Sequence, residues 1–215
     1  MRFLITAGPT REPIDPVRYL SNRSSGKMGY AIAEAAIDAG HDVVLISGPV
    51  HDDPPDAVKF VSVSTGDEMF DAVHRHVGDC DVFVMCAAVA DYRPKQVSKT
   101  KIKKSDAKLS LELIPTRDIL SSLPEQDRHY VVVGFAAETE DIEANAQKKL
   151  QQKRCDMIVA NDARIGMESD ENEVTIFFRS GEKQKIPRAS KKIVANELVK
   201  FFANAREKRL TKKMS

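Results

Sequence analysis

The chain has 215 residues, enough to bury a core without disulfide bonds or a structural metal. It carries 33 lysine and arginine residues against 32 aspartate and glutamate residues, a formal net charge of +1. This near balance argues against nucleic acid or an acidic membrane as the main partner, because both select a strong basic excess. The three cysteines form no C-x-x-C pair, and no apolar run reaches the roughly 20 residues of a membrane span. We therefore expect one cytoplasmic domain, residues 1–215, with reduced thiols.

The first part of the chain alternates apolar runs with amphipathic segments. Residues 2–7 predict a buried strand and residues 9–24 a long loop interrupted by prolines. Residues 25–39 place apolar side chains at i, i+3, i+4 and i+7, which predicts a helix, and residues 43–46 predict a second strand. A strand, a helix and a strand within about fifty residues indicate a βαβ unit and a parallel sheet.

The same alternation continues along the chain. Further predicted strands lie at 58–63, 82–85, 130–133 and 157–160, and further predicted helices at 65–77, 139–154 and 191–205. Repeated β/α alternation with apolar strands predicts a doubly wound α/β fold, that is, a mostly parallel Rossmann-like sheet with helices on both faces.

Three segments depart from this rhythm. Residues 92–113 are rich in lysine and end in alternating leucines, which predicts an exposed β-hairpin flap. Residues 172–186 predict a second hairpin near the sheet edge. The basic tail at 206–215 is interpreted as a solvated terminus.

Ligands of open parallel sheets bind beyond the carboxyl ends of the strands, where this chain has mostly small residues. The segment 21–29 leads into the first predicted helix, whose free N–H groups and dipole favour a phosphate or a carboxylate. Ser24 and Ser25 would add hydroxyl groups and Lys27 a charge. A serine N-cap followed by glycines that pack the helix on the sheet explains the same residues, and the pattern leaves both interpretations open.

Two nucleotide-binding motifs are absent from this region. A P-loop requires Ser or Thr after its lysine, but Met28 follows Lys27. A dinucleotide fingerprint requires three spaced glycines after the first strand and an acidic residue after the second, where the chain has Ser47. Tyr92 and Lys95 suggest a reductase pair, but Pro94 between them prevents the helix that such a pair needs. Nicotinamide chemistry is therefore disfavoured.

Several charged residues have both a structural and a functional interpretation. The run at 101–104 could be a solvated face, or Lys101 could be carried on a closing loop to a phosphoryl group. Lys149 and Lys153 suit the helix dipole, worth about 0.3–1 kcal/mol per charge, but they also share one helical face and could grip a polyphosphate together. Spacing does not decide between these alternatives.

Two residues follow the strand predicted at 82–85. Cys86 is best interpreted as a small buried thiol, because no histidine stands near a strand end to activate it. Asp91 follows a run of small apolar residues, where a lone carboxylate could bind a base edge or a ribose.

Taken together, the motifs resemble a known family, the phosphopantothenate–cysteine ligases of coenzyme A synthesis. The resemblance is carried by seven collinear blocks that span nearly the whole chain, at 5–8, 10–19, 21–29, 87–91, 101–104, 134–139 and 160–162. It implies an enzyme that joins 4'-phosphopantothenate to L-cysteine through an acyl-cytidylate, with CTP converted to CMP and pyrophosphate. Mg²⁺ is expected to accompany the triphosphate, and the resemblance assigns it no protein ligand.

The resemblance also implies roles for individual residues. Lys101 would assist formation of the acyl-nucleotide, and Asn22 would hold this intermediate for attack by cysteine. Arg18, Ala87 and Ala88 would contact the substrate together with Asn22. Binding of the nucleotide and its phosphates would involve Ser24, Ser25, Gly26, Lys27, Asp91, Lys101, Asp118, Ile119, Phe135, Lys149 and Lys153.

Members of this family are commonly dimers, so we expect a homodimer that forms through the hairpin at 172–186 or through the flap. Because the chain begins at the first strand of the ligase unit, we expect no flavin and no decarboxylation. Arg117 stands where the family pattern has a proline, which leaves the choice of CTP over ATP open. The alternatives are an NAD(P)-binding oxidoreductase of similar fold and a non-catalytic nucleotide-binding regulator.

Overall fold

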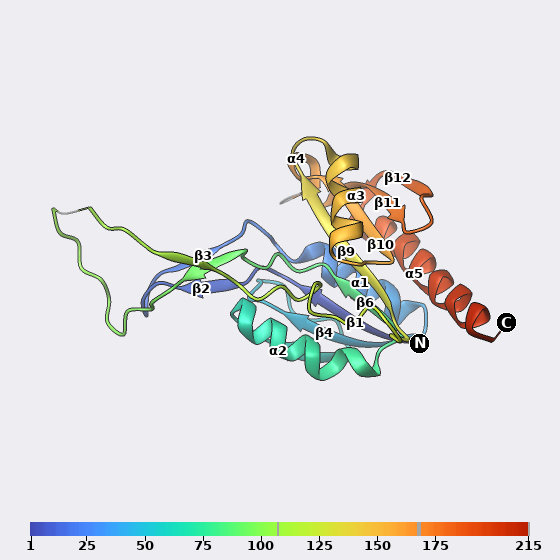
Figure 1. Cartoon of the computed structure of the whole chain (residues 1–215), viewed down its shortest axis with the longest axis horizontal. Helices are drawn as coiled ribbons and strands as arrows, with labels where there is room; N and C mark the ends of the chain where they lie inside the picture. The colour runs from blue at the N-terminus through green and yellow to red at the C-terminus, as the bar shows by residue number, and fades with distance from the viewer. Residues whose placement is uncertain (107, 167–168, 215) are drawn as a thin grey trace.

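The chain folds around an eight-stranded sheet with the strand order β12-β11-β10-β9-β6-β1-β4-β5 (Figure 1). The computed structural model describes residues 1–106, 108–166 and 169–214. Neighbouring strands from β10 to β5 run parallel, and β11 and β12 complete one edge as an antiparallel hairpin. In chain order the strands are β1 (Arg2–Ala7), β4 (Asp42–Ser47), β5 (Lys59–Ser62), β6 (Val82–Met85), β9 (Val131–Glu138), β10 (Met157–Asp162), β11 (Glu171–Phe178) and β12 (Lys183–Ser190).

Helices cover both faces of this sheet. On one face α1 (Lys27–Asp38) packs against α5 (Lys191–Met214), and on the other lie α2 (Gly66–His76) and α3 (Ile142–Gln152). The short helices η1 (Val77–Asp79) and α4 (Ala163–Gly166) follow α2 and β10. No helix in the described part of the chain is long and apolar enough to cross a membrane.

Covering both faces explains why the strands are continuous apolar runs. In β1, the side chains of Phe3 and Ile5 join the cluster under α1 and α5, whereas Leu4 joins the cluster under α2 and α3. The predicted doubly wound, mostly parallel α/β fold is confirmed, and so is the hairpin at the sheet edge.

The segment predicted as a loop at 9–24 contains a short antiparallel hairpin instead. Its strands are β2 (Arg11–Pro13) and β3 (Tyr19–Ser21), each of three residues. Strands this short carry no apolar alternation, so periodicity could not identify them. The Asp15 carboxylate closes the connecting turn by accepting hydrogen bonds from the N–H groups of Val17 (2.8 Å) and Arg18 (2.9 Å).

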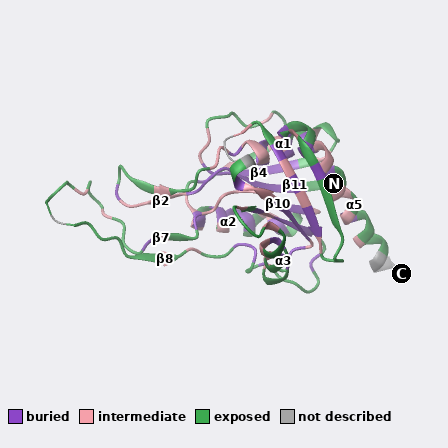
Figure 2. Cartoon of the chain, turned by 90° about the horizontal axis from the view of Figure 1, so that it is seen from above, coloured by how far each residue is buried: buried purple, intermediate pink, exposed green. Residues whose placement is uncertain are grey.

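The lysine-rich segment at 92–113 forms the predicted flap. Its stem consists of β7 (Tyr92–Pro94) and β8 (Leu113–Pro115), and beyond the stem the chain runs outward as a long exposed loop (Figures 1 and 2). Ala107, within this segment, lies outside the described residues. The β2–β3 turn lies against the loop, because Ser98 donates its N–H to the Ile14 carbonyl oxygen at 3.0 Å. We refer to residues 11–21 and 92–115 together as the arm.

Two strands run further than predicted. β9 continues to Glu138 and β10 to Asp162, with these two residues paired at the end of their ladder. Gly134, Phe135 and Asn161, which were predicted to follow their strands, therefore lie within them. Backbone hydrogen bonding between β9 and β10 continues past the last apolar residue of each strand, so both strands are longer than their apolar runs. By contrast, α3 is shorter than the helix predicted at 139–154, and Asp141 before it adopts a left-handed φ of 47°.

Residues 206–214, expected as a solvated terminus, continue α5 as a helix; residues 207, 208, 210 and 211 are exposed, but two arginines anchor the segment to the sheet. Arg206 is buried and donates two hydrogen bonds to Asp81 Oδ1, at 3.0 and 3.1 Å. Arg209 donates to the Asp156 carboxylate and to the Tyr130 carbonyl oxygen. These partners are distant in sequence, so the local composition could not reveal them. Ser215 lies outside the described residues.

We expect Arg206→Met to lower the free energy of unfolding by about 1.5–3 kcal/mol, because hydrogen bonds to a charged group are lost. Urea denaturation would measure the change. Lys208→Met, an exposed position on the same helix, is the matched control and should shift stability by less than about 0.5 kcal/mol. Equal effects of the two substitutions would mean that the end of α5 contributes no anchoring contact.

Candidate active site

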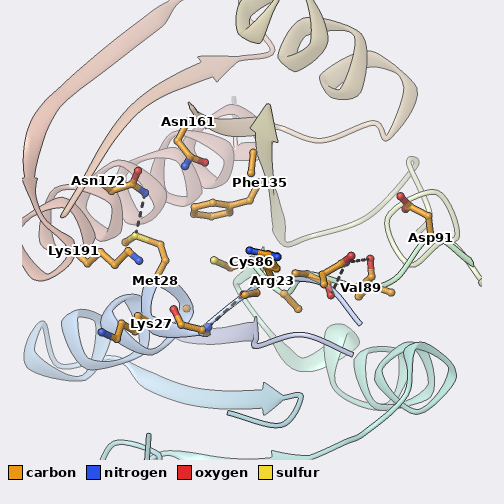
Figure 3. Close-up of a pocket in the computed structure, with 18 of the residues that line it drawn as sticks. Arg23, Lys27, Met28, Cys86, Val89, Asp91, Phe135, Asn161, Asn172 and Lys191 are labelled. Atoms are coloured by element: carbon orange, nitrogen blue, oxygen red, sulfur yellow. Dashed lines mark hydrogen bonds between the residues drawn. The ribbon is translucent and has the colours of Figure 1, made fainter. Parts of the chain in front are cut away.

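A pocket of about 380 Å³ lies at the carboxyl ends of the central strands (Figure 3). It is formed by the segment between β3 and α1, by the segment after β6 and by residues of β9 and β10. From β1 the chain proceeds toward β4 and β5 on one side, whereas β6, β9 and β10 extend the sheet on the other. The pocket therefore lies where the strand order reverses, which is the usual ligand position in such sheets.

Many residues selected from the sequence meet in this pocket. Those that line it are Asn22, Ser24, Ser25, Gly26, Lys27, Ala87, Ala88, Asp91, Phe135 and Lys149. Those that lie outside its lining are Arg18, Lys101, Asp118, Ile119 and Lys153. Further lining residues, which the sequence interpretation did not select as site residues, are Arg23, Met28, Gly29, Cys86, Val89, Ala137, Asn161, Asn172 and Lys191.

The N-terminus of α1 opens onto this pocket without a side-chain cap. The N-cap is Gly26, with a left-handed φ of 79°, and no side chain in the described part of the chain makes a capping hydrogen bond there. The suggestion that Ser24 or Ser25 caps the helix is therefore wrong; the Ser24 hydroxyl instead accepts from the Gly26 N–H at 3.3 Å. Residues 26–29 line the pocket, so the positive end of the helix is available to an anion. The packing role expected of Gly29 is present, since a Cβ there would meet the Ala7 Cβ at 2.6 Å.

Asn22 fixes the segment that leads into α1. Its side-chain amide donates to the carbonyl oxygens of Ala88 (3.2 Å) and Val89 (3.1 Å), which belong to the segment after β6. These two hydrogen bonds hold two walls of the pocket together. Asn22 is exposed, so its carboxamide also remains accessible to a ligand.

The lining is strongly positive. It holds four cationic side chains, those of Arg23, Lys27, Lys149 and Lys191, while Asp91 is the one carboxylate among its described residues. Lys149 donates to the Phe135 carbonyl oxygen at 2.7 Å. Burial lowers the pKa of Lys149, and the nearby Glu138 carboxylate offsets part of this effect. Such an excess of cations over one carboxylate suits a ligand that carries several negative charges.

Arg18 lies on the arm and contacts the flap. Its guanidinium donates to Asp15 Oδ2 at 2.5 and 3.0 Å and to the Ile102 carbonyl oxygen at 2.6 Å. The buried Asp15 carboxylate also accepts from the Ile102 N–H at 3.1 Å. The hydrogen bond from Arg18 holds the pKa of Asp15 well below its usual range, although burial opposes this. These contacts fix the flap at the residue next to Lys101, which is itself exposed and outside the pocket lining.

Three of the predicted nucleotide-binding residues lie beside the pocket rather than in it. Ile119 is buried in the core under α2 and α3, so the fold leaves no surface of its side chain for a ligand. Asp118 pairs with Lys153 and also accepts from the Ser121 N–H at 3.0 Å. Although burial alone would raise the pKa of Asp118, the Lys153 ammonium lowers it.

Arg117, the departure from the family pattern, faces α2. It pairs with Asp67 (2.8 Å) and Asp71 (2.9 Å), and its guanidinium lies 4.1 Å from the centre of the Phe70 ring. The side chain is therefore held by α2 and lies outside the pocket lining. The arginine at this position anchors its loop to α2.

Cys86 lines the pocket, but its chemistry is not that of a nucleophile. Burial raises the pKa of Cys86 to about 12, so the thiol stays protonated near neutral pH. All three cysteines are free, as expected from their number and spacing. The interpretation of Cys86 as a structural thiol agrees with this environment.

The described residues hold no group of three or more His, Cys, Asp or Glu side chains that could cage a metal. A Mg²⁺ ion does not require three protein ligands, because it commonly binds through one or two carboxylates together with substrate phosphates and water. Asp91 is the carboxylate that the pocket lining offers. The donor set therefore fits a metal ion that arrives with a phosphorylated ligand.

Comparison with known proteins decides the family. Residues 1–205 match the family model described as the C-terminal domain of DNA/pantothenate metabolism flavoproteins. The chain belongs to this family. The bifunctional coenzyme A biosynthesis protein CoaBC of Bacillus subtilis is 48% identical over 204 residues, covering 93% of this chain and 50% of the relative. CoaBC of Escherichia coli strain K12 is 46% identical over 190 residues, covering 85% of this chain and 47% of the relative.

The chain thus spans about half the length of these curated relatives. Two solved structures share its fold. The C-terminal domain of CoaBC superposes with a TM-score of 0.81 at 43% identity, covering 100% of this chain and 96% of that one. A mutant of Cab2 in complex with phosphopantothenate-cysteine has a TM-score of 0.84 at 16% identity, covering 100% and 89%, which is a likeness of fold. The family resemblance deduced from the sequence motifs is confirmed.

Proposed function

We propose that this chain is a phosphopantothenate–cysteine ligase that uses CTP and acts in the cytoplasm. The observation that carries the proposal is the pocket at the strand-order reversal, where four cations, of which Lys27 is paired with Asp170, and an uncapped helix N-terminus surround one lining carboxylate. A nucleoside triphosphate and a phosphorylated acid both supply the negative charge that such a pocket requires. Membership of the family and the similarity to CoaBC proteins point to coenzyme A synthesis.

In the proposed first step, the carboxylate of 4'-phosphopantothenate attacks the α-phosphorus of CTP. A carboxylate oxygen forms the new bond to the α-phosphorus. The bond from this phosphorus to the bridging oxygen breaks, and pyrophosphate leaves with its electron pair. Negative charge develops on the phosphate oxygens, so preorganised N–H groups and cations supply most of the rate enhancement. We assign this role to the N-terminus of α1, to the Ser24 and Ser25 hydroxyls and to Lys27, with Lys101 delivered by the flap.

In the second step, the amino group of L-cysteine attacks the carbonyl carbon of the acyl-cytidylate. The amide bond forms, the bond to the nucleotide oxygen breaks, and CMP leaves while the attacking nitrogen loses a proton. We assign Asn22 to the intermediate, since its carboxamide is exposed beside Ala87 and Ala88. Asp91 and Phe135 would border the nucleoside, and Lys149 its phosphates. Closure of the flap would shield the mixed anhydride from water.

Mg²⁺ would bind to the phosphate oxygens of the nucleotide and neutralise part of their charge. Asp91 is the side chain of the lining suited to contact it. The residues that act on the phosphates in this proposal, Lys27 and Lys149, are cations and do not depend on the metal for their position.

The proposal is tested with purified protein, 4'-phosphopantothenate, L-cysteine and CTP. We expect pyrophosphate and CMP to appear in equal amounts, with one amide formed for each CTP consumed. Omission of cysteine should leave acyl-cytidylate and pyrophosphate at about one equivalent per active site. Pyrophosphate release that does not depend on the acid would contradict the ligase proposal. Repeating the assay with ATP in place of CTP measures which nucleotide the protein prefers.

Two alternative functions predict other results. An NAD(P)-binding oxidoreductase of similar fold would bind a dinucleotide, and titration with NADPH would detect it. A non-catalytic nucleotide-binding regulator would bind CTP and release no product, and in it Asn22 and Lys101 would be dispensable.

We further propose a homodimer that forms through the arm. The exposed large apolar side chains of the arm are Val17, Tyr19, Tyr92, Val97, Leu109, Leu111 and Leu113. The alternative contact, the edge hairpin, is a poorer candidate because its outer strand β12 carries charged side chains that disfavour pairing with another strand. An apolar surface of this extent suits burial against a second copy.

We expect the double substitution Leu109→Ser and Leu111→Ser to weaken the dimer at least tenfold, since one buried leucine contributes roughly 1.5–3 kcal/mol. Sedimentation equilibrium measures the dissociation constant. Ile193→Ser, at an exposed position on α5, is the control and should leave it unchanged. An unaltered dimer in the double variant would contradict the role of the arm.

A further inference from the structure

One end of the pocket holds hydrogen-bond donors that the sequence motifs and the family pattern left unassigned. Figure 3 shows Lys191, Asn172 and Lys27 gathered around Met28 at this end, with Asp91 at the opposite end. Lys191 is the first residue of α5, and Asn172 belongs to β11. Both come from the part of the chain after β10, which the sequence analysis did not connect with the pocket.

Lys191 is a buried cation without a protein partner. The residue is 7% exposed, and its ammonium makes no hydrogen bond or ion pair with any described residue. Burial, and then repulsion from Lys27, lower the pKa of Lys191, and the charge of Asp170 offsets part of this effect. This carboxylate is already paired with Lys27 at 2.6 Å. The side chain of Lys191 is largely removed from water and its ammonium has no counter-ion of its own, so its environment favours an anion bound in the pocket.

The position of Lys191 in its helix adds to this cost. Lys191 and Lys192 begin α5, and the first turn contains no acidic residue. The positive end of the helix dipole disfavours cations there. Burial, the neighbouring Lys27 and the helix dipole all act against the charge of Lys191, and an anion placed between these groups would offset all three.

Asn172 contributes a second unsatisfied donor. It is 4% exposed, and its side-chain oxygen accepts from the Glu173 N–H at 3.1 Å. Among the described residues, its side-chain nitrogen has the Met28 sulfur as its one partner, at 3.8 Å. A thioether is a weak acceptor, so this amide can donate a better hydrogen bond to an oxygen in the pocket.

We propose that Lys191 and Asn172, together with Lys27, form a subsite for a phosphate group at the end of the pocket opposite Asp91. The ligand identity rests on the proposed function, which supplies two sources of phosphate. One is the phosphate chain of the nucleotide, released as pyrophosphate, and the other is the phosphate monoester of 4'-phosphopantothenate. Both offer oxygens to the same donors, and the experiment distinguishes them.

The test is calorimetric titration of the whole chain with inorganic pyrophosphate and, separately, with 4'-phosphopantothenate. Lys191→Met should weaken binding of one of the two ligands on the order of tenfold to a hundredfold, because a charge-assisted hydrogen bond is lost. The affected ligand identifies the source, and the KM of the corresponding substrate should rise by a similar factor. Lys192→Met, at the exposed neighbouring position, should bind both ligands like the unsubstituted chain.

Thermal unfolding separates binding from structure. Lys191→Met should not lower Tm, because it replaces an unpaired buried charge with an apolar chain of similar length. Lower Tm with unchanged affinities would mean a structural role and would overturn the inference. If Lys191→Met binds both ligands with unchanged affinity while the unsubstituted chain is an active ligase, the subsite is overturned and the proposed function stands. Failure of the unsubstituted chain to bind either ligand or to form product overturns both the subsite and the proposed ligase function.

Discussion

Lys101→Gln should reduce the rate of acyl-nucleotide formation by at least about a hundredfold and leave the affinity for CTP within about twofold. Lys101 lies on the exposed flap and outside the pocket lining, so it should contribute little to the initial binding of the nucleotide. Its ammonium has no hydrogen-bond or ion-pair partner among the described residues, so glutamine should not disturb the fold. The loss should fall on the step in which charge develops on the phosphate oxygens, when the flap has closed.

Rapid-quench measurement of acyl-cytidylate in a single turnover isolates this step. Lys103→Gln is the matched control, because it removes an exposed lysine from the same loop and should leave the rate unchanged. Calorimetric titration with CTP gives the affinity of each variant. If Lys101→Gln forms the intermediate at the normal rate, Lys101 has no part in the chemistry, and a slow rate in both variants would indicate a general effect of flap charge.

The contacts of the β2–β3 turn explain how an exposed lysine can still be positioned. Asp15 and Arg18 together hold both the N–H and the carbonyl oxygen of Ile102. The residue next to Lys101 is thereby fixed to the arm, while Lys101 itself stays free to reach a ligand. Arg18 was assigned to the substrate on the basis of the family resemblance, and in this structure its guanidinium holds the flap.

Much of the fold could be predicted because both faces of the sheet are covered. Side chains on both sides of each central strand are therefore apolar, as in Leu4 and its neighbours Phe3 and Ile5. Such apolar runs, separated by amphipathic helices, can be recognised in the sequence. The elements that the sequence pattern missed depend on pairing at long range. β2 and β3 have no apolar alternation, and the end of α5 is fixed by ion pairs with Asp81 and Asp156.

The candidate site could be predicted in part. Asp91 was found because it follows a predicted strand, whereas Asn22 and Lys149 received their roles through the family resemblance, and all three line the pocket at the edge where parallel topology gathers the strand ends. Lys191 and Asn172 could not be found in this way, since they belong to an edge hairpin and the helix after it. One local signal existed, because two lysines at the start of a helix oppose its dipole.

Gly26→Ala should lower the free energy of unfolding by about 2–5 kcal/mol and weaken CTP binding at least tenfold. A left-handed backbone costs a non-glycine residue about 1–2 kcal/mol, and Gly26 has a φ of 79°. In addition, a Cβ at this position would lie 2.5 Å from Val50 Cγ1 and 3.3 Å from the Gly8 Cα, and overpacking of this kind typically costs about 1–3 kcal/mol. Relief of this contact would displace residues 22–27, which present the helix N-terminus to the phosphates.

Gly40→Ala separates the two causes. Gly40 has nearly the same φ, 78°, but a Cβ there would meet no described residue within 4 Å. This substitution should therefore cost only the strain of the left-handed backbone and leave CTP affinity unchanged. Adding Val50→Ala to Gly26→Ala should restore part of both stability and affinity, because it removes the closest contact. Urea denaturation and calorimetric titration measure the two quantities. Normal CTP affinity in Gly26→Ala would show that the segment before α1 does not hold the nucleotide, and the phosphate site would then have to lie elsewhere in the pocket.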